Sequence, residues 1–254
     1  MCCVTRSIWR WCSPRATRNT CPIATAITVL TTTALTTATP ARSERLSHPQ
    51  GHDPIVLAVS GASAQPLAQR ALQLLLQAEE RVELVVSRGA IGVWQAELGV
   101  RVPSEPDAQE RFWRERTGCE SGSLRCHRWN DQATGIASGS YRTRGMVILP
   151  CSMGAVGRIA SGVATDLLER CADVHLKEGR PLVICPRETP WNLVHLRNLT
   201  ALAEAGARIA PPVPAWYHQP TSIEEMVDFL VIRVFDCLGY DLGNLQRWSG
   251  PIQS

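Results

Sequence analysis

The sequence has little net charge, few aromatic residues and no long hydrophobic run. Of its 254 residues, 26 are basic and 23 are acidic, and only 6% are aromatic. A balance this close provides no basic surface of the kind that nucleic acid requires. The apolar stretch at residues 22–41 is rich in threonine, so it is a poor membrane span. These absences leave a globular protein, long enough for one large domain or two small ones.

The sequence also lacks cysteines and histidines at the spacing of a metal site, although it contains ten cysteines. Four of them lie in the first 21 residues and the other six are spread singly. The nearest approach to a cluster is Cys119 with Cys126 and His127, and no second pair of ligands follows it. We therefore expect no metal site, and we expect the later cysteines to be free buried thiols in a reduced cytosol.

The first fifty residues differ from the rest of the chain. They contain six arginines and a single acidic residue, Glu44. This composition resembles an organellar transit peptide, and the stretch that ends in Ala38–Ala41 loosely resembles a secretory signal. We favour a disordered or mis-annotated extension at residues 1–50, followed by one domain at 51–254, and we expect a cytoplasmic protein.

Short apolar runs alternate with segments of helical periodicity from Ile55 onward. We predict strands at five places, which are residues 55–59, 82–86, 146–149, 181–185 and 207–210. Helices are predicted between them, with a last helix after the capping-box sequence Ser222–Glu225. The polar residues 101–130 are predicted to be irregular, and Pro150 is predicted to end its strand. The pattern predicts an α/β fold, an open parallel sheet with helices on both faces.

Small and hydroxyl residues follow three of these strands. Ser60–Ser63 follows the first strand, Ser87-Arg88 the second, and Cys151–Gly154 the third. Ligands of such sheets bind at the carboxyl ends of the strands, and helix N-termini favour anions. Each string is weak evidence alone, because a tight turn between a strand and a helix explains it equally well.

Cations and aromatic residues occur in the later loops and helices. Arg170 and Lys177 fall on one side of a helix if that segment stays helical, although spacing alone favours a solvated charged face. Arg187 and Glu188 stand side by side between two prolines, and Tyr217 lies in an aromatic loop bounded by prolines. Arg233 interrupts an apolar helix, which indicates a paired or ligand-facing cation. The residues thus predict a phosphate-binding, aromatic-lined pocket without indicating a reaction.

Seven strings together resemble the UbiX flavin prenyltransferases, in the order that this family has them. They are Ser60–Ser63, Ala137–Ser140, Met146–Met153, Ala172–Glu178, Pro186–Pro190, His195–Asn198 and Trp216–Pro220. The resemblance covers roughly residues 55–250 and is specific because it rests on the whole set. It implies a Rossmann-like flavoprotein fold. It also implies a transferase that joins the dimethylallyl group of dimethylallyl phosphate to reduced FMN. The product, prenylated FMN, would serve UbiD-type decarboxylases, including the one in ubiquinone biosynthesis.

The resemblance also implies the roles of individual residues. It implies FMN contacts at Gly61, Ala62, Ser63, Ser87, Ser152, Met153 and Arg170. It implies dimethylallyl-phosphate contacts at Lys177, Arg187, Tyr217 and Arg233. It implies catalytic roles for Glu188, Glu97, Trp248 and Lys177. Three cations and a phenol suit a dianionic phosphate, and no metal is required if they carry it. A homo-dodecamer is implied as the assembly, with no membrane span and no nucleic acid.

Several positions depart from the family pattern, and the pair Gln65-Pro66 is atypical. Ala64 replaces a glycine, Asp166 stands where asparagine is usual, and Gln132 occupies a position that is often aromatic. These departures concern flavin binding and leave the phosphate-binding residues intact.

Two alternatives stay open. One is an FMN-dependent cysteine decarboxylase of the same fold, which would need a histidine base early in the chain. Residues 55–80 contain no histidine. The other is a flavin-binding protein without catalysis.

Overall fold

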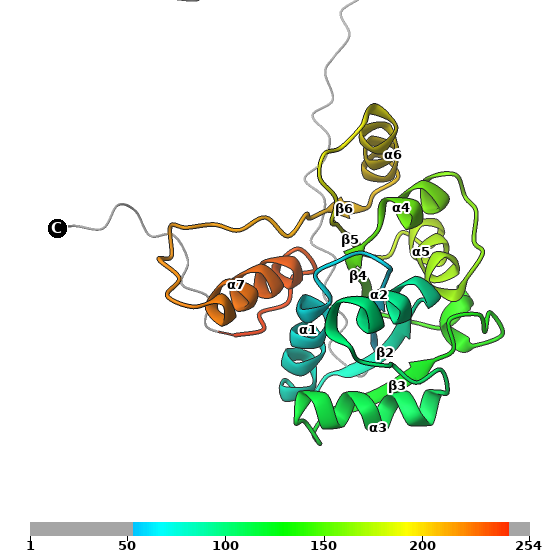
Figure 1. The fold of residues 1–254 in the computed structure, drawn as a ribbon. Helices are drawn as coiled ribbons and strands as arrows, with labels where there is room; N and C mark the ends of the chain where they lie inside the picture. Colours follow the sequence, from blue (N-terminus) through cyan, green and yellow to red (C-terminus); the bar gives the residue numbers. More distant parts are fainter. Residues whose placement is uncertain (1–52, 244–254) are drawn as a thin grey trace, which may run out of the picture. The chain divides into compact units, whose positions relative to one another are not determined.

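The computed structural model describes residues 53–243, so the predicted N-terminal extension and Trp248 lie outside the described residues. Six parallel strands form one sheet in the order β3-β2-β1-β4-β5-β6 (Figure 1). Their bounds are Ile55–Val59 (β1), Arg81–Val86 (β2), Ser123–His127 (β3), Gly145–Cys151 (β4), Leu182–Pro186 (β5) and Arg208–Ile209 (β6). The strand order reverses between β1 and β4, which lie next to each other at the centre of the sheet.

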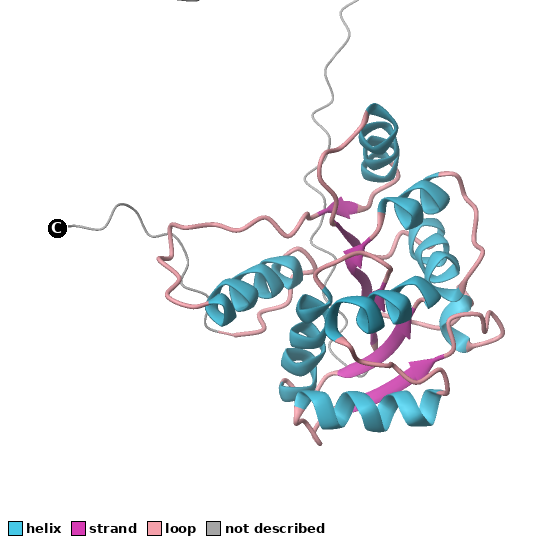
Figure 2. Cartoon of the chain, viewed as in Figure 1, coloured by secondary structure: helices cyan, strands magenta, loops and turns pink. Residues whose placement is uncertain are grey.

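Helices cover both faces of this sheet, as the sequence predicts (Figure 2). The helices are Gln65–Gln77 (α1), Arg88–Leu98 (α2), Pro106–Thr117 (α3), Met153–Ala160 (α4), Leu167–Lys177 (α5), Leu193–Glu204 (α6) and Ile223–Asp236 (α7). Alternate residues of β1 point to opposite sides. Leu57 packs with α1, α2, α3 and α7, whereas Val56 and Ala58 pack with α4, α5 and α6. Burial on both faces explains why the central strands are uninterrupted apolar runs.

The prediction that residues 101–130 are irregular is wrong, because they contain α3 and the edge strand β3. The many charged residues of α3 make its apolar side hard to recognise in the sequence. On that side Trp113 is buried and packs edge-on against Trp94, with 5.2 Å between the ring centroids. Local signals for this helix are present, with Pro106 in its first turn and Gly118 after its end. The strand β3 alternates between exposed and buried residues over most of its length, as an edge strand does.

Two smaller expectations also need correction. The strand β4 does not end at Pro150 but continues to Cys151, with an irregular register against β5. The capping box at α7 is only half formed. The Ser222 hydroxyl accepts from the Glu225 amide, but the Glu225 carboxylate accepts from Thr221 instead of Ser222. No helix within residues 53–243 is long and apolar enough to cross a membrane.

A buried hydrogen-bonded cluster fixes the edge of the sheet next to the segment that follows β3. The Glu83 carboxylate of β2 lies 2.5 Å from His127 Nε2 and accepts a hydrogen bond from the Tyr141 hydroxyl at 2.6 Å. The Thr134 hydroxyl lies 3.0 Å from His127 Nδ1. Burial alone would raise the pKa of Glu83, but the hydrogen bonds from His127 and Tyr141 outweigh it and lower that pKa. The cluster therefore holds both ends of the loop between His127 and Tyr141.

We predict that Tyr141→Phe lowers the free energy of unfolding by about 1–2 kcal/mol at pH 7, because Glu83 loses a charge-assisted hydrogen bond. Urea unfolding measures this loss. The matched control is Tyr240→Phe, because the buried Tyr240 hydroxyl has no hydrogen-bond partner among the described residues. This control should leave stability nearly unchanged.

The loss should also depend on pH. Since the pKa of Glu83 is lower in the folded protein, its carboxylate stabilises the fold above the ordinary value of 4.5. That contribution disappears as the pH falls through the folded pKa. The difference between wild type and Tyr141→Phe should therefore shrink in acid, and a difference that grows in acid would contradict this assignment.

Candidate functional site

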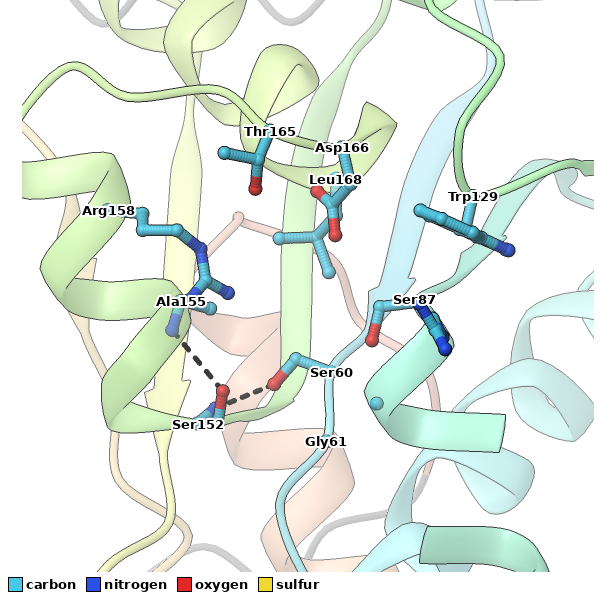
Figure 3. Close-up of a pocket in the computed structure, with 12 residues that line it drawn as sticks. Ser60, Gly61, Ser87, Trp129, Ser152, Ala155, Arg158, Thr165, Asp166 and Leu168 are labelled. Atoms are coloured by element: carbon cyan, nitrogen blue, oxygen red, sulfur yellow. Dashed lines mark hydrogen bonds between the residues drawn. The ribbon is translucent and has the colours of Figure 1, made fainter. Parts of the chain in front are cut away.

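A cavity of about 380 Å³ opens at the carboxyl ends of β1, β2 and β4 (Figure 3). This is the point where the strand order reverses, which is where open α/β sheets bind their ligands. Its lining consists of Ser60, Gly61, Ser87, Arg88, Gly89, Trp129, Ser152, Ala155, Arg158, Thr165, Asp166 and Leu168.

Ser60 joins the ends of the two central strands beneath this cavity. Its hydroxyl donates to the Pro150 carbonyl at 3.0 Å and accepts from the Ser152 amide at 2.6 Å. Its own amide donates to the same Pro150 carbonyl at 3.1 Å. The side chain is buried, so these bonds are protected from water. Ser60 therefore fixes the start of α4 relative to the end of β1.

Three helices begin at the cavity wall, and each is capped by a residue that lines it. Ser87 Oγ accepts from the Ala90 amide of α2, and Ser152 Oγ accepts from the Ala155 amide of α4. The Asp166 carboxylate accepts from the Glu169 amide of α5 at 2.9 Å. The remaining amides of the first turns carry partial positive charge, which suits an anion. Burial raises the pKa of Asp166 above its ordinary value.

Two glycines allow the loop after β1 to contact the start of α2. A Cβ atom on Gly61 would lie 2.8 Å from the carbonyl carbon of Gly89, which is backbone and cannot rotate away. Gly61 is therefore required by this close approach, which sets the width of the cavity between β1 and α2.

Three of the predicted FMN contacts, Gly61, Ser87 and Ser152, line the cavity. The other four do not line it. Ala62 is buried in the loop after β1, and Met153 is buried at the start of α4. The Ser63 hydroxyl donates to the predicted catalytic carboxylate of Glu97 at 3.1 Å, so the structure brings these two together. Arg170 donates to the Ala137 carbonyl and pairs with Asp173. The roles of all seven remain predictions.

The residues predicted to bind dimethylallyl phosphate do not line the cavity of a single chain. Lys177 is the last residue of α5 and pairs with Glu178, about 15 Å along the helix from the end that lines the cavity. Arg187 follows β5, and its amide donates to the Cys151 carbonyl next to Ser152. Arg233 lies on α7, which covers the opposite face of the sheet from α5, and pairs with Asp236 (Figure 1).

The remaining predicted residues lie in loops. Tyr217 is 43% exposed in the segment before α7. The exposed Glu188 carboxylate accepts a hydrogen bond from the amide of its neighbour Thr189. Two of the strings that resemble the family meet at the end of α5, where Gly139 lies beside the ends of the Lys177 and Glu178 side chains. Within residues 53–243 no three His, Cys, Asp or Glu side chains converge as a metal site would.

Sequence reasoning missed several cavity residues, of which Trp129 and Arg158 are the largest. The expected aromatic position is occupied by Gln132, which is exposed, but Trp129 places an aromatic ring at the cavity instead. Ala64 adopts a left-handed conformation with φ of 80° at the start of α1 and offers no side-chain cap. The neighbouring Gln65 side chain donates to the carbonyls of Ser60 and Ala62 and so holds the loop before the helix.

Comparison with known proteins agrees with this arrangement. The family model described as Flavoprotein matches residues 43–235. A protein of Synechocystis named flavin prenyltransferase UbiX is 57% identical over 201 residues, which cover 79% of this chain and 98% of the relative. A flavin prenyltransferase UbiX of Pseudomonas aeruginosa is 42% identical and covers 78% of this chain and 95% of its own length.

Two solved structures are similar over nearly the whole of their own chains. A structure of AnUbiX (PadA1) in complex with FMN and dimethylallyl pyrophosphate has a TM-score of 0.69 and 37% identity, and it covers 79% of this chain and 99% of its own. A dodecameric FMN-dependent UbiX-like decarboxylase of Escherichia coli O157:H7 has a TM-score of 0.68 and 35% identity, and it covers 78% and 100%.

We predict that Gly61→Ala weakens FMN binding at least about 10-fold and lowers stability by about 1–3 kcal/mol, because the new methyl group forces β1 and α2 apart. Flavin fluorescence titration and thermal unfolding measure the two effects. The matched control is Gly92→Ala on α2, where a Cβ atom meets nothing within 4 Å. That variant should bind FMN normally and gain up to about 1 kcal/mol of stability. Equal behaviour of the two variants would show that the contact between Gly61 and Gly89 does not shape the site.

Proposed function

The chain belongs to the UbiX flavin prenyltransferase family, and on this premise we propose that it transfers the dimethylallyl group of dimethylallyl phosphate to reduced FMN. The observation that carries the proposal is the high identity to a flavin prenyltransferase along almost the whole of that relative. The product would be prenylated FMN, and a UbiD-type decarboxylase would receive it, with ubiquinone biosynthesis as the expected pathway. FMN would bind in the cavity at the ends of β1, β2 and β4.

In this proposal, the chain's cations hold the phosphate throughout the reaction. Lys177, Arg187 and Arg233, with the hydroxyl of Tyr217, bind the phosphate oxygens. As the bond between the allylic carbon and the phosphate oxygen breaks, phosphate leaves with the electron pair, and these charges stabilise it. The allylic carbon becomes bonded to the flavin. Glu188 accepts a proton as the new ring forms, and Glu97 with Ser63 orients the flavin.

A second copy of the chain is needed to complete this phosphate site. In one chain, α5 and α7 lie on opposite faces of the sheet, so Lys177 and Arg233 do not converge. Large apolar side chains are exposed on the later part of the chain, with Val194 of α6 at 62% and Trp216 before α7 at 72%. Exposed apolar surface of this kind marks contacts between subunits. We propose a homo-dodecamer, the state named for the E. coli neighbour.

The cytoplasm is the compartment that we propose for the assembled enzyme. The residues with the composition of a targeting segment lie outside the described part of the chain.

Anaerobic incubation with reduced FMN and dimethylallyl phosphate tests the proposed reaction. Mass spectrometry should show a flavin heavier by one dimethylallyl unit, and Glu188→Gln should bind both substrates but form the finished product more slowly. A parallel incubation with dimethylallyl pyrophosphate tests which donor the enzyme prefers. An unmodified flavin with both donors would contradict the proposal, and release of CO₂ from a cysteine substrate would support the decarboxylase alternative.

Lys177 offers a direct test of the phosphate site because it is the only lysine in the chain. An amine-specific reagent should therefore modify one side chain besides the N-terminus. Dimethylallyl phosphate should protect Lys177 from the reagent, and Arg233→Ala should raise the concentration needed for protection about 10- to 100-fold. Arg208→Ala, at the far edge of the sheet, is the control and should leave protection unchanged. If dimethylallyl phosphate does not slow the labelling of Lys177, then Lys177 does not belong to the phosphate site.

A further inference from the structure

Arg158 is a charged residue of the cavity wall to which the proposed function gives no role. It lies on α4, and its Nε donates to the carboxylate of Glu169 on α5. The Glu169 side chain is completely buried. Its other oxygen accepts from both the amide and the hydroxyl of Thr165, each at 2.7 Å. A buried carboxylate without a cation would be costly, so Glu169 and Arg158 fix one another in place.

This pairing uses only one of the three nitrogens of the guanidinium group. Within residues 53–243, the two Nη groups of Arg158 have no hydrogen-bond partner. The side chain runs back along α4, where Nη1 lies 3.4 Å from the position of a Cβ atom on Gly154. Figure 3 shows the guanidinium group beside Ser152 and Ala155, at the first turn of the helix. A full positive charge thus lies next to the helix amides that already favour an anion.

The walls of the cavity differ in chemical character, with an aromatic side chain on one side and charged side chains on the other. Trp129 lies across the cavity from Arg158 (Figure 3). Aromatic side chains suit a flavin ring, whereas two free Nη groups match two oxygens of a phosphate. The nearby carboxylate of Asp166 also faces the cavity, so a dianion could not approach this wall without a compensating cation.

We propose that Arg158 binds the phosphate group of FMN and makes the site select FMN over riboflavin, with Glu169 and Thr165 as its positioning residues. This inference rests on the proposed function, because it takes FMN as the flavin that enters the cavity.

Binding of FMN and of riboflavin to the full-length protein, each measured by fluorescence titration, tests this inference. Arg158→Ala should weaken FMN binding about 10- to 100-fold and change riboflavin binding by less than about 3-fold. Since Arg158→Ala leaves the buried Glu169 charge unpaired and can unfold the chain, Arg158→Lys is the second variant. Lysine keeps a positive charge near Glu169 but cannot present two further donors to a phosphate. It should reduce the FMN preference by a smaller factor. Arg208→Ala, an exposed arginine outside the cavity, should keep the wild-type ratio.

Glu169→Gln tests the positioning role while Arg158 stays in place. It should lower the FMN preference without abolishing it, because the guanidinium group then lacks its anchor. A general loss of structure would weaken both flavins equally, so an equal loss in the folded Arg158 variants would overturn the inference.

The phosphate could instead come from dimethylallyl phosphate, and a separate measurement distinguishes the two. At saturating reduced FMN, the Arg158→Lys variant should keep the wild-type KM for dimethylallyl phosphate. A raised KM together with an unchanged ratio of FMN to riboflavin affinity would overturn the inference. If the wild type prefers FMN through Arg158 yet forms no prenylated flavin, the proposed function fails while this assignment stands.

Discussion

The hydrogen bonds of Ser60 are the constraint on which the rest of the site depends. They join the end of β1 to the end of β4, and these are the two strands between which the strand order reverses. Helices leave the two strands toward opposite faces of the sheet, so a crevice opens there. Because Ser60 holds the Ser152 amide, the first turn of α4 has a fixed distance from the loop after β1. The close approach of Gly61 to Gly89 then sets the position of α2, and the cavity follows from these contacts.

Charge is arranged around this crevice in two separate groups. One group belongs to the cavity itself, where Arg158 and the starts of α2, α4 and α5 favour an anion. The other consists of Lys177, Arg187 and Arg233, which lie outside the cavity on α5, after β5 and on α7. An enzyme that joins two phosphorylated substrates needs two anion sites, so that each phosphate is held while the reacting carbon atoms meet. The first group lies within one chain, and we propose that the second is completed by a neighbouring copy.

The sequence was sufficient to predict those parts of the fold that depend on local pattern. The apolar runs of β1, β2, β4 and β5 and the small residues after them are visible in a single chain, and so are Gly61, Ser87 and Ser152 in the cavity. The helix α3 was missed because its charged face outweighs the one side that buries Trp113. Arg158 is missed because it lies inside α4, and Trp129 is missed because β3, the strand before it, is not predicted. Their place in the cavity depends on how α4 packs against α5 and on the loop that the Glu83 cluster fixes.

The phosphate site that we propose could not be assembled from the sequence or from one chain, because in this proposal it depends on contacts between copies. Co-expression of Lys177→Ala and Arg233→Ala chains tests this central claim most directly. Each variant alone should be inactive in prenyl transfer, whereas mixed assemblies should regain activity, because some sites receive an intact Lys177 from one chain and an intact Arg233 from another. Mixed assemblies that form normally and stay as inactive as the separate variants would contradict the account, since both residues would then act from the same chain.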